Sequence, residues 1–261
     1  MNDTVYSSDL TDEQWEAIEP MLPKRSSRGR PPLYTRRELL EAIFYLLRTG
    51  CQWRMIPQGM PHWQSCYGFF AKLKKLGLWR RIHDSLRERI RLAAGKKKAP
   101  TAGIIDSQSV KSACHGGPRG YDAGKKINGR KRHILVDTLG LVLLCQVHTA
   151  DVQDRDGARL LLAGLEKLFG WISLIWADGG YAGKLVEWVG GLERHRKVRL
   201  EIVKRSDKAK GFEVLPRRWV VERTFGWLVL QRRLCRDYET KLSSAEAMIH
   251  IAMTRLMLER I

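Results

Sequence analysis

The sequence predicts an α/β protein, in which an N-terminal helical region precedes a region that mixes strands and helices. Two observations support this fold class. Apolar residues recur with helical spacing over residues 1 to about 95. After a charged hinge at 95–100 (GKKKAP), short alternating or continuous apolar runs alternate with helical segments. We therefore expect a helical region over 1–98 and an α/β region over 99–261.

Short helices account for the N-terminal region. Thr11 followed by Gln14 has the pattern of a capping box, which marks the start of a first helix. A dense apolar stripe over 35–48 predicts a second helix, and Gly50 stands where a C-terminal cap belongs. Two further helices are expected at 63–76 and 79–94.

The helix expected at 63–76 carries a basic group near its end, made of Lys72, Lys74 and Lys75. A basic helix within a set of short helices is typical of a helix-turn-helix DNA-binding region. A small helical bundle that does not touch DNA has the same pattern, so both interpretations stand at this point.

The α/β region begins with an alternating run at 101–110, which predicts a strand. The tetrapeptide at 137–140 (DTLG) separates two apolar runs and predicts a hairpin. Pro216 suits the first turn of a long helix, and Ser243 or Ser244 suits the N-cap of the last one. Expected strands occupy 101–110, 133–136, 141–148, 171–177 and 199–204, and expected helices occupy 156–169, 185–194, 216–236 and 243–260.

The chain is strongly basic, with 47 Lys and Arg against 28 Asp and Glu and a formal net charge of +19. A surplus of this size repels itself in the folded state, and a polyanionic partner is the usual reason to tolerate it. Nucleic acid is therefore the leading candidate partner, ahead of an anionic membrane surface. A protein that is merely basic is the plainer alternative.

Several other classes of protein are disfavoured. The longest apolar run, at 139–147, is far shorter than the ~20 residues that span a bilayer. The N-terminal segment lacks the basic and apolar regions of a secretory signal. The five cysteines are widely spaced without a CxxC pair, which argues against a disulfide scaffold and a structural zinc site. We expect a cytoplasmic protein with a buried core, no membrane contact and no organic cofactor.

Three acidic residues occupy positions suited to chemistry. Asp106 lies within the apolar strand pattern GIID, where a carboxylate is costly to desolvate without a positive partner. Asp178 ends the apolar run WISLIWAD, at the tip of an expected strand, a common place for ligand chemistry in α/β sheets. Glu222 lies on the long helix, on the same face as Arg218. Each has a plainer interpretation: a turn residue for either aspartate, and a helical ion-pair partner of Arg218 for Glu222.

Carboxylates brought together in so basic a protein repel one another unless cations intervene. Oxygen ligands suit Mg²⁺ or Mn²⁺, and two such ions ~3.5–4 Å apart activate an attacking hydroxyl and stabilise the leaving oxygen of a phosphodiester. We therefore expect Asp106, Asp178 and Glu222 to be catalytic residues and ligands of two metal ions, with Asp106 bridging them. A competing acidic cluster at 151–156 is interpreted mainly as turn and helix-start residues.

Two basic tracts, at 96–133 and 194–236, support a polyanionic partner. The second interleaves aromatic residues with arginines, which suits phosphate contacts combined with base stacking, although burial in the core is an equal alternative for Trp219. The histidines lack metal-ligand spacing and a paired nucleophile, so triad catalysis is not expected. The residues expected to contact DNA are Lys125, Lys126, Arg130, Lys131, Arg132, Arg218, Trp219, Arg223, Arg232 and Arg233.

Segments from most of the chain resemble bacterial insertion-sequence transposases of the insertion sequence five family. The resemblance implies a DDE-class enzyme with a ribonuclease H-like catalytic domain, a mixed sheet flanked by helices. By position, the three catalytic acids of the family fall on Asp106, Asp178 and Glu222, and its arginine ahead of the glutamate falls on Arg218. The matching segments are LTDEQWEAIEPMLP (10–23), GRPPLYTRRELLEAIFYLLRTGCQWRMIP (29–57), GIIDSQSVK (103–111), GYDAGKKINGRKRHILVDTLG (120–140), ADGGYAG (177–183) and PRRWVVERTFGWL (216–228).

The resemblance implies excision and insertion of a mobile DNA segment by metal-dependent cleavage and strand transfer. Water attacks first, and the freed 3′-hydroxyl then attacks target DNA. Two subunits pair the inverted-repeat ends, which implies a homodimer or higher oligomer on double-stranded DNA, in the bacterial cytoplasm and on the nucleoid. Three alternatives are kept: a ribonuclease H-like nuclease that cuts without joining, a catalytically inactive DNA-binding protein derived from a transposase, and a basic scaffold on RNA.

Overall fold

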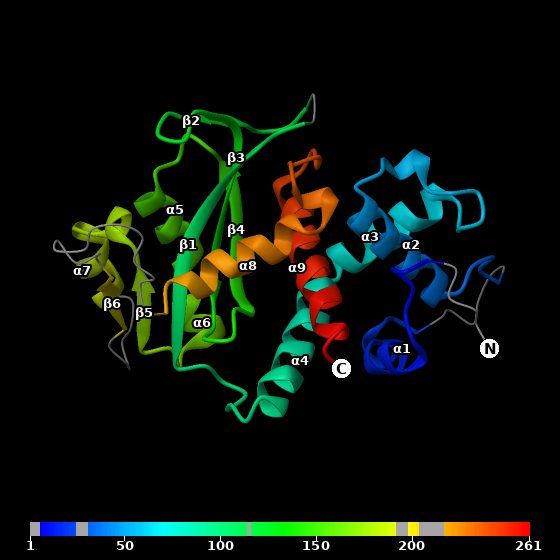
Figure 1. The fold of residues 1–261 in the computed structure, drawn as a ribbon, viewed down its shortest axis with the longest axis horizontal. Coiled ribbons are helices and arrows are strands. Elements are labelled where there is room, and N and C mark those ends of the chain that lie inside the picture. The colour runs from blue at the N-terminus through cyan, green and yellow to red at the C-terminus, as the bar shows by residue number, and fades with distance from the viewer. Residues whose placement is uncertain (1–5, 25–30, 114–115, 192–197, 204–216) are drawn as a thin grey trace.

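The computed structural model describes residues 6–24, 31–113, 116–191, 198–203 and 217–261. Figure 1 shows the N-terminal helices gathered at one end of the molecule and a curved sheet at the other. Two helices, α4 (Leu78–Ala93) and α9 (Leu242–Leu258), pack against each other between these parts. The last helix of the chain therefore lies beside the helix that leads into the sheet.

Local sequence signals begin and end the N-terminal helices. Thr11 and Thr35 each accept a backbone hydrogen bond at the N-cap, and the Gln or Glu three residues later accepts one from the N-cap backbone in return. Gly50 ends the second helix in the left-handed conformation at φ +72°. The predicted capping box at Thr11 and the predicted cap at Gly50 are confirmed. The remaining elements of this part are α1 (Asp12–Ile18), η1 (Glu19–Met21), α2 (Arg36–Thr49), η2 (Trp53–Met55) and α3 (Trp63–Lys75).

Within the described residues, six strands form one mixed sheet, as the predicted fold class requires. The strand β3 pairs antiparallel with β1 along one edge, and with β2 and then β4 along the other. The strand β5 pairs parallel with β1, and β6 pairs parallel with β5. The predicted hairpin is the β3–β4 pair. The strands are β1 (Ala102–Lys111), β2 (Gly120–Asp122), β3 (Ile127–Val136), β4 (Val142–Thr149), β5 (Leu174–Ala177) and β6 (Arg199–Ile202).

Helices cover both faces of the sheet. On one face α8 and α9 pack against a core that includes Ile104. On the other face α5, α6 and α7 contribute to a second core that includes Ile105. Because alternate strand residues point to opposite faces, these two isoleucines define which face each later residue of β1 takes. The helices and turns of this part are α5 (Asp154–Leu162), α6 (Leu165–Phe169), η3 (Gly179–Tyr181), α7 (Lys184–Gly190), α8 (Trp219–Val229) and η4 (Arg232–Leu234).

Two predicted helices differ in extent from the structure. The segment expected as one helix at 156–169 forms two, because α5 ends at Leu162 and Gly164 stands at the N-cap of α6. The helix expected over 216–236 ends at Val229, where the chain turns so that Arg233 reaches Glu239.

Other differences concern the ends of elements. The last helix has Lys241 at its N-cap without a side-chain hydrogen bond, so neither Ser243 nor Ser244 caps it. Pro216 and the ends of the elements expected at 185–194 and 199–204 lie outside the described residues.

One hydrophobic cluster extends across the predicted boundary between residues 98 and 99. It includes Leu40 and Phe44 of α2, Ile104 of β1 and Met248 of α9. The helical region and the sheet therefore share a core through α4 and α9. The division into two domains stays a prediction.

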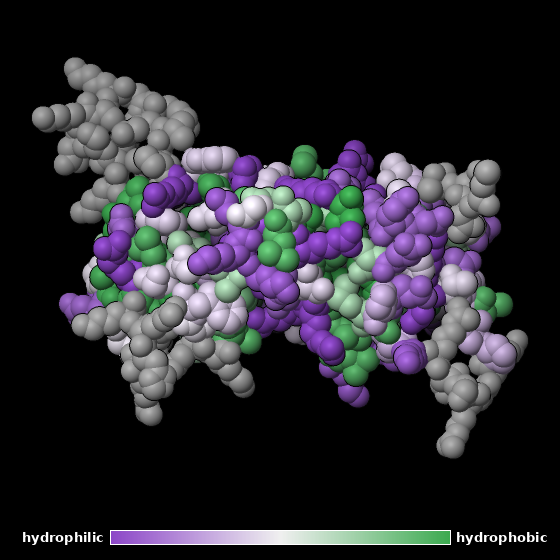
Figure 2. Space-filling view, turned by 90° about the horizontal axis from the view of Figure 1, so that it is seen from below, coloured by the Kyte–Doolittle hydropathy of each residue, from purple (hydrophilic) through white to green (hydrophobic). Residues whose placement is uncertain are grey.

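Figure 2 shows hydrophilic side chains over most of the face it presents, with apolar residues in small separate patches. Among the described helices, none combines the length and the apolar character needed to cross a membrane. Among the described residues, Cys51, Cys66, Cys145 and Cys235 carry free thiols.

The strand β3 carries Arg130, Lys131 and Arg132 in succession, and all three side chains are buried. Alternate strand residues face opposite sides of the sheet, so the side chains of the two arginines lie on one face and that of the lysine lies on the other. Arg130 pairs with Asp237 at 3.0 Å and donates to the carbonyl oxygen of Pro118 at 2.9 Å. Arg130 thereby ties the centre of the sheet to the segment that follows η4.

The structure differs here from the expectation that these cations contact DNA. Arg132 donates to the carbonyl oxygen of Leu234 at 2.7 Å, and Lys131 pairs with Asp154 at 3.0 Å. Arg233 is also buried, where it meets Glu239. Acceptors inside the protein take the donors of four of these residues, which are therefore not exposed to DNA: Arg130, Lys131, Arg132 and Arg233.

Replacing Arg130 by alanine would leave Asp237 buried and charged without its partner. We expect Arg130→Ala to lower the free energy of unfolding by about 3–5 kcal/mol, as is typical when one member of a buried pair is removed. Urea unfolding measured by circular dichroism tests this. Arg236→Ala, at an exposed position of the same segment, is the control and should change the value by less than about 0.5 kcal/mol. Equal stability of Arg130→Ala and the wild type would contradict this role.

Candidate active site

Two neighbouring parallel strands carry Asp106 and Asp178 to the same end of the sheet. In the pairing of β1 with β5, Ile104 lies opposite Trp176. Each aspartate follows two residues later, so the two hold matching positions on chains about 4.8 Å apart. Residues two apart in a strand share a face, and Ile104 and Trp176 both belong to the core beneath α8. The strand register therefore brings the two acids side by side on the α8 face.

Arg218 joins Asp178 to Glu222. It stands at the N-cap of α8, and Glu222 lies one turn later on that helix. The guanidinium Nη2 donates to Glu222 Oε1 at 2.5 Å, and Nη1 lies 3.5 Å from Asp178 Oδ2. One guanidinium therefore lies between two of the predicted acids, and Asp106 joins this acid cluster through its neighbour Asp178.

Asp106 experiences the strongest electrostatic effect in this cluster. Burial raises the pKa of its carboxyl to about 6, and the negative charge of Asp178 adds to the rise. The backbone N–H of Ser107 donates to Asp106 Oδ1 at 2.7 Å, and the positive charges of Arg218 and Lys125 also act to lower the pKa. The pKa of Asp106 stays above its usual range chiefly because the carboxyl is buried, and a nearby cation would favour its ionised form.

The loop between β2 and β3 brings Lys125 beside Asp106. Asp122 accepts a hydrogen bond from the backbone N–H of Lys125 at 3.0 Å, which fixes the loop. Lys125 Nζ donates to the carbonyl oxygen of Ser107 at 3.3 Å. Lys126 follows with φ +55°, and both lysines are exposed. These two predicted DNA contacts therefore stay at the surface next to the acids.

One side of α8, which is partly buried, carries a ladder of alternating aromatic rings and guanidinium groups. Arg223 lies 4.6 Å from the ring centroid of Trp219 and 4.5 Å from that of Trp227. Arg223 also donates to the carbonyl oxygen of Leu139 at 2.9 Å. The guanidinium of Arg260 also lies over Trp227, 4.6 Å from its ring centroid. Trp219 is 43% exposed, so it is a surface residue rather than a core residue. Arg232, beyond the end of α8, is also exposed.

A chain of hydrogen bonds supports the turn that follows Asp178. His148 Nδ1 lies 2.8 Å from the carbonyl oxygen of Thr149, which can only accept, so Nδ1 carries the proton. His148 Nε2 then accepts from His133 Nδ1 at 2.8 Å, and His133 Nε2 accepts from the hydroxyl of Tyr181 at 3.1 Å. Burial lowers the pKa of His133 to about 3, so this ring is neutral at pH 7. Tyr181 ends η3, and the chain therefore ties the Asp178 turn to β3.

Sequence reasoning assigns no role to these histidines or to Tyr181. A signal exists in the hairpin register, because His133 lies opposite Gln146 and His148 is two residues further on the same face. A second signal is Gly157 of α5, where a Cβ would lie 2.4 Å from His133 Cε1. The absence of a side chain there lets the helix pack over the paired rings.

The competing acidic cluster at 151–156 has a structural role. Asp154, in the first turn of α5, accepts a hydrogen bond from the Ser107 hydroxyl at 2.8 Å and pairs with Lys131. Asp151 and Asp156 are exposed. The Ser107 hydroxyl beside Asp106 is therefore already committed to Asp154.

Among the described residues, no group of three or more His, Cys, Asp or Glu side chains is placed to hold a metal ion. Arg218 supplies the positive charge between Asp178 and Glu222 in the arrangement described. The donor chemistry fits a hard divalent cation, because all three acids offer carboxylate oxygens. The raised pKa of Asp106 agrees with this, since a cation would relieve the crowding of negative charge. Mg²⁺ or Mn²⁺ therefore fits by charge and donor type.

Comparisons with known proteins agree on one group. Residues 97–257 match the family described as Transposase DDE domain. Residues 10–83 match the family described as Putative transposase of IS4/5 family. The Insertion element IS402 uncharacterized 16.2 kDa protein of Burkholderia cepacia is 31% identical over 110 residues, which cover 40% of this chain and 73% of that protein. No solved structure matches the chain.

Removing the Tyr181 hydroxyl would leave His133 Nε2 buried without a donor. We expect Tyr181→Phe to lower the free energy of unfolding by about 1–3 kcal/mol, the cost of an unsatisfied buried polar group. Urea unfolding provides the measurement. Tyr121→Phe makes the same chemical change at a residue that is 55% exposed, and it serves as the control. If both variants lose the same small amount, the hydrogen-bond chain does not support the turn.

Proposed function

The chain belongs to the transposase DDE domain family, in its IS4/5 group, and we propose that it cuts DNA at the ends of a mobile element and joins the freed 3′ ends to target DNA. The observation that carries this proposal is the cluster of Asp106, Asp178 and Glu222, with Arg218 between two of them. In a protein with a net charge of +19, such a cluster suits catalysis by positioning and charge neutralisation, as in phosphoryl transfer generally.

In this proposal Asp106, Asp178 and Glu222 are the catalytic residues and would hold two divalent ions, with Asp106 as the ligand that the ions would share. Bound Mg²⁺ or Mn²⁺ would supply activation of the attacking hydroxyl and neutralisation of the leaving oxygen. The raised pKa of Asp106 supports the assignment. Arg218, which pairs with Asp178 and Glu222, would orient a phosphate of the DNA once the acids are neutralised.

Cleavage and joining are two displacements at phosphorus. In the first, a water oxygen bonds to the phosphorus and the bond to the 3′ oxygen breaks, which leaves a 3′-hydroxyl and a 5′-phosphate. In the second, that 3′-hydroxyl attacks a phosphodiester of the target and displaces the next 3′ oxygen. Neither step needs a covalent bond to the protein. The hydroxyl next to Asp106, that of Ser107, is accordingly not needed as a nucleophile, and it donates a hydrogen bond to Asp154.

The DNA contacts are proposed for the predicted residues that remain at or near the surface. Trp219 is exposed beside Arg223, and a base that stacks on such a ring gains about 1–3 kcal/mol. Basic residues around the acids would bind phosphates. The proposed contacts are Lys125, Lys126, Arg218, Trp219, Arg223 and Arg232.

The partners follow from the same proposal. Joining both ends of one element requires two active sites, so we propose that a homodimer or higher oligomer assembles on double-stranded DNA. Such an enzyme would act on the nucleoid, in the bacterial cytoplasm.

A plasmid that carries the element with its native flanks tests the proposal. With Mg²⁺ or Mn²⁺, we expect the wild type to cut at the element ends. Asp178→Ala should reduce the rate by at least ~10²-fold, the scale of losing one interaction with the developing charge. Asp156→Ala is the control, because it removes an exposed acid from the first turn of α5. Gel analysis of ends and joined products gives the result.

Two outcomes would contradict the proposal in different ways. Equal DNA binding by wild type and Asp178→Ala, with no cutting by either, would favour an inactive DNA-binding protein derived from a transposase. Metal-dependent cuts without joined products would favour a nuclease that lacks strand transfer.

A further inference from the structure

A turn with three lysines connects α4 to β1. Its backbone is held from the inside by Arg91, whose Nε donates to the carbonyl oxygens of Lys97 at 2.8 Å and Lys98 at 3.2 Å. Arg91 also pairs with the buried Asp137, which offsets its charge. The turn is thus fixed in shape, while the side chain of Lys96 and its two lysine neighbours stay exposed.

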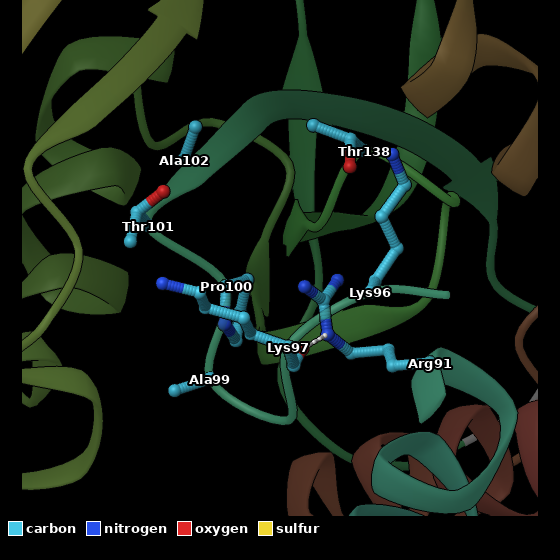
Figure 3. Close-up of a pocket in the computed structure, with 8 residues that line it drawn as sticks. All are labelled: Arg91, Lys96, Lys97, Ala99, Pro100, Thr101, Ala102 and Thr138. Carbon is cyan, nitrogen blue, oxygen red and sulfur yellow. Dashed lines mark hydrogen bonds between the residues drawn. The ribbon is translucent and has the colours of Figure 1, made fainter. Parts of the chain in front are cut away.

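The turn borders a cavity of about 210 Å³ at the start of β1. Figure 3 shows the Lys96 side chain extending toward Thr138 and the Lys97 side chain toward Thr101, with the Arg91 guanidinium between them. Ammonium, guanidinium and hydroxyl groups can all donate hydrogen bonds. A cavity with this lining suits the oxygen atoms of an anion.

A second cavity of about 310 Å³ shares Lys96 and Thr138 with the first. Its apolar wall is made of Ile104, Trp176 and Val220. Each of these three stands two residues before one of the acids in the cluster. Because the two strand residues share a face with their acids, the second cavity adjoins the acid cluster. The two cavities together form a groove that leads from the acids to the lysine turn.

The cations of this groove are available to a ligand. Lys96, Lys97 and Arg217 make no ion pair with a carboxylate of the described part of the chain. Arg217 instead lies over the Trp176 ring, 4.5 Å from its centroid. Lys98 differs from its neighbours in the turn, because its Nζ lies 3.8 Å from Glu88 on α4.

We propose that the lysine groove, formed by Lys96, Lys97, Thr138 and Arg217, binds the sugar–phosphate backbone of one DNA strand next to the bond that is cut. The cations and the threonine hydroxyl bind the phosphates. This inference rests on the proposed function and extends it to a surface formed by the turn between α4 and β1 and by residues beside the acids.

The groove has a suitable length for a strand. From Asp106 back to Ala102, β1 covers about 13 Å at ~3.3 Å per residue. This length suits a short stretch of one strand's sugar–phosphate backbone. The strand of the element end and the strand of the target share this chemistry, and the experiment below distinguishes them.

The salt dependence of DNA binding by the full chain tests the proposal. Two fluorescent duplexes of equal length serve as probes, one taken from an element end with its flank and one of unrelated sequence. The double variant Lys96→Ala/Lys97→Ala removes two exposed cations, and Lys98→Ala removes the paired one as the control. The slope of log K against log salt is negative, and for the double variant we expect its magnitude to decrease by about 1.8, at ~0.9 per lost phosphate contact. Lys98→Ala should keep the wild-type slope.

Each outcome has a defined meaning. A fall confined to the element-end duplex assigns the groove to the donor strand, and a fall on both duplexes assigns it to target and donor backbones alike. An unchanged slope on both duplexes would overturn the proposal. If the wild type still cuts the plasmid in that case, the proposed function survives without the groove. A reduced slope in a protein that never cuts would leave the groove and remove the proposed function.

Discussion

The balance of charge around Arg218 is the constraint on which the rest of the site depends. Carboxylates that converge at one end of a sheet repel one another, and burial adds to the cost for Asp106. One guanidinium between Asp178 and Glu222 offsets part of this repulsion. We therefore expect the bound molecules to include cations at the acids and an anion on the basic surface around them. Divalent cations and a phosphodiester meet both requirements together.

Buried polar contacts hold the strands that carry the acids. The chain from Tyr181 through His133 ties the Asp178 turn to β3, and Arg130 ties β3 to Asp237 beyond η4. A buried ion pair adds little net stability over an apolar pair, yet losing one partner is costly. These contacts therefore fix geometry more than they stabilise the fold, which suits a site that must keep its ligands within about half an ångström.

The sequence predicts well those features that depend on neighbours along the chain. The cap at Gly50 and the hairpin turn follow from local patterns, and the acids stand out because each occupies a strand or helix position where a carboxylate is unusual. The burial of Arg130 is not predictable in this way, because Asp237 lies 107 residues away. Nothing in the local sequence distinguishes a lysine or arginine that faces DNA from one that faces a carbonyl inside the protein. The break after Leu162 does have a local signal, Gly164, which stands at the N-cap of α6.

The central claim, that three acids form one cation-binding cluster, is tested most directly by titrating Asp106. Carboxyl-detected NMR of the metal-free protein should give a pKa of about 6, because burial and the charge of Asp178 penalise the ionised form. Adding Mg²⁺ should lower the pKa markedly, since a cation at the carboxylates favours ionisation. A pKa near the ordinary value of 3.8, unmoved by Mg²⁺, would contradict the claim.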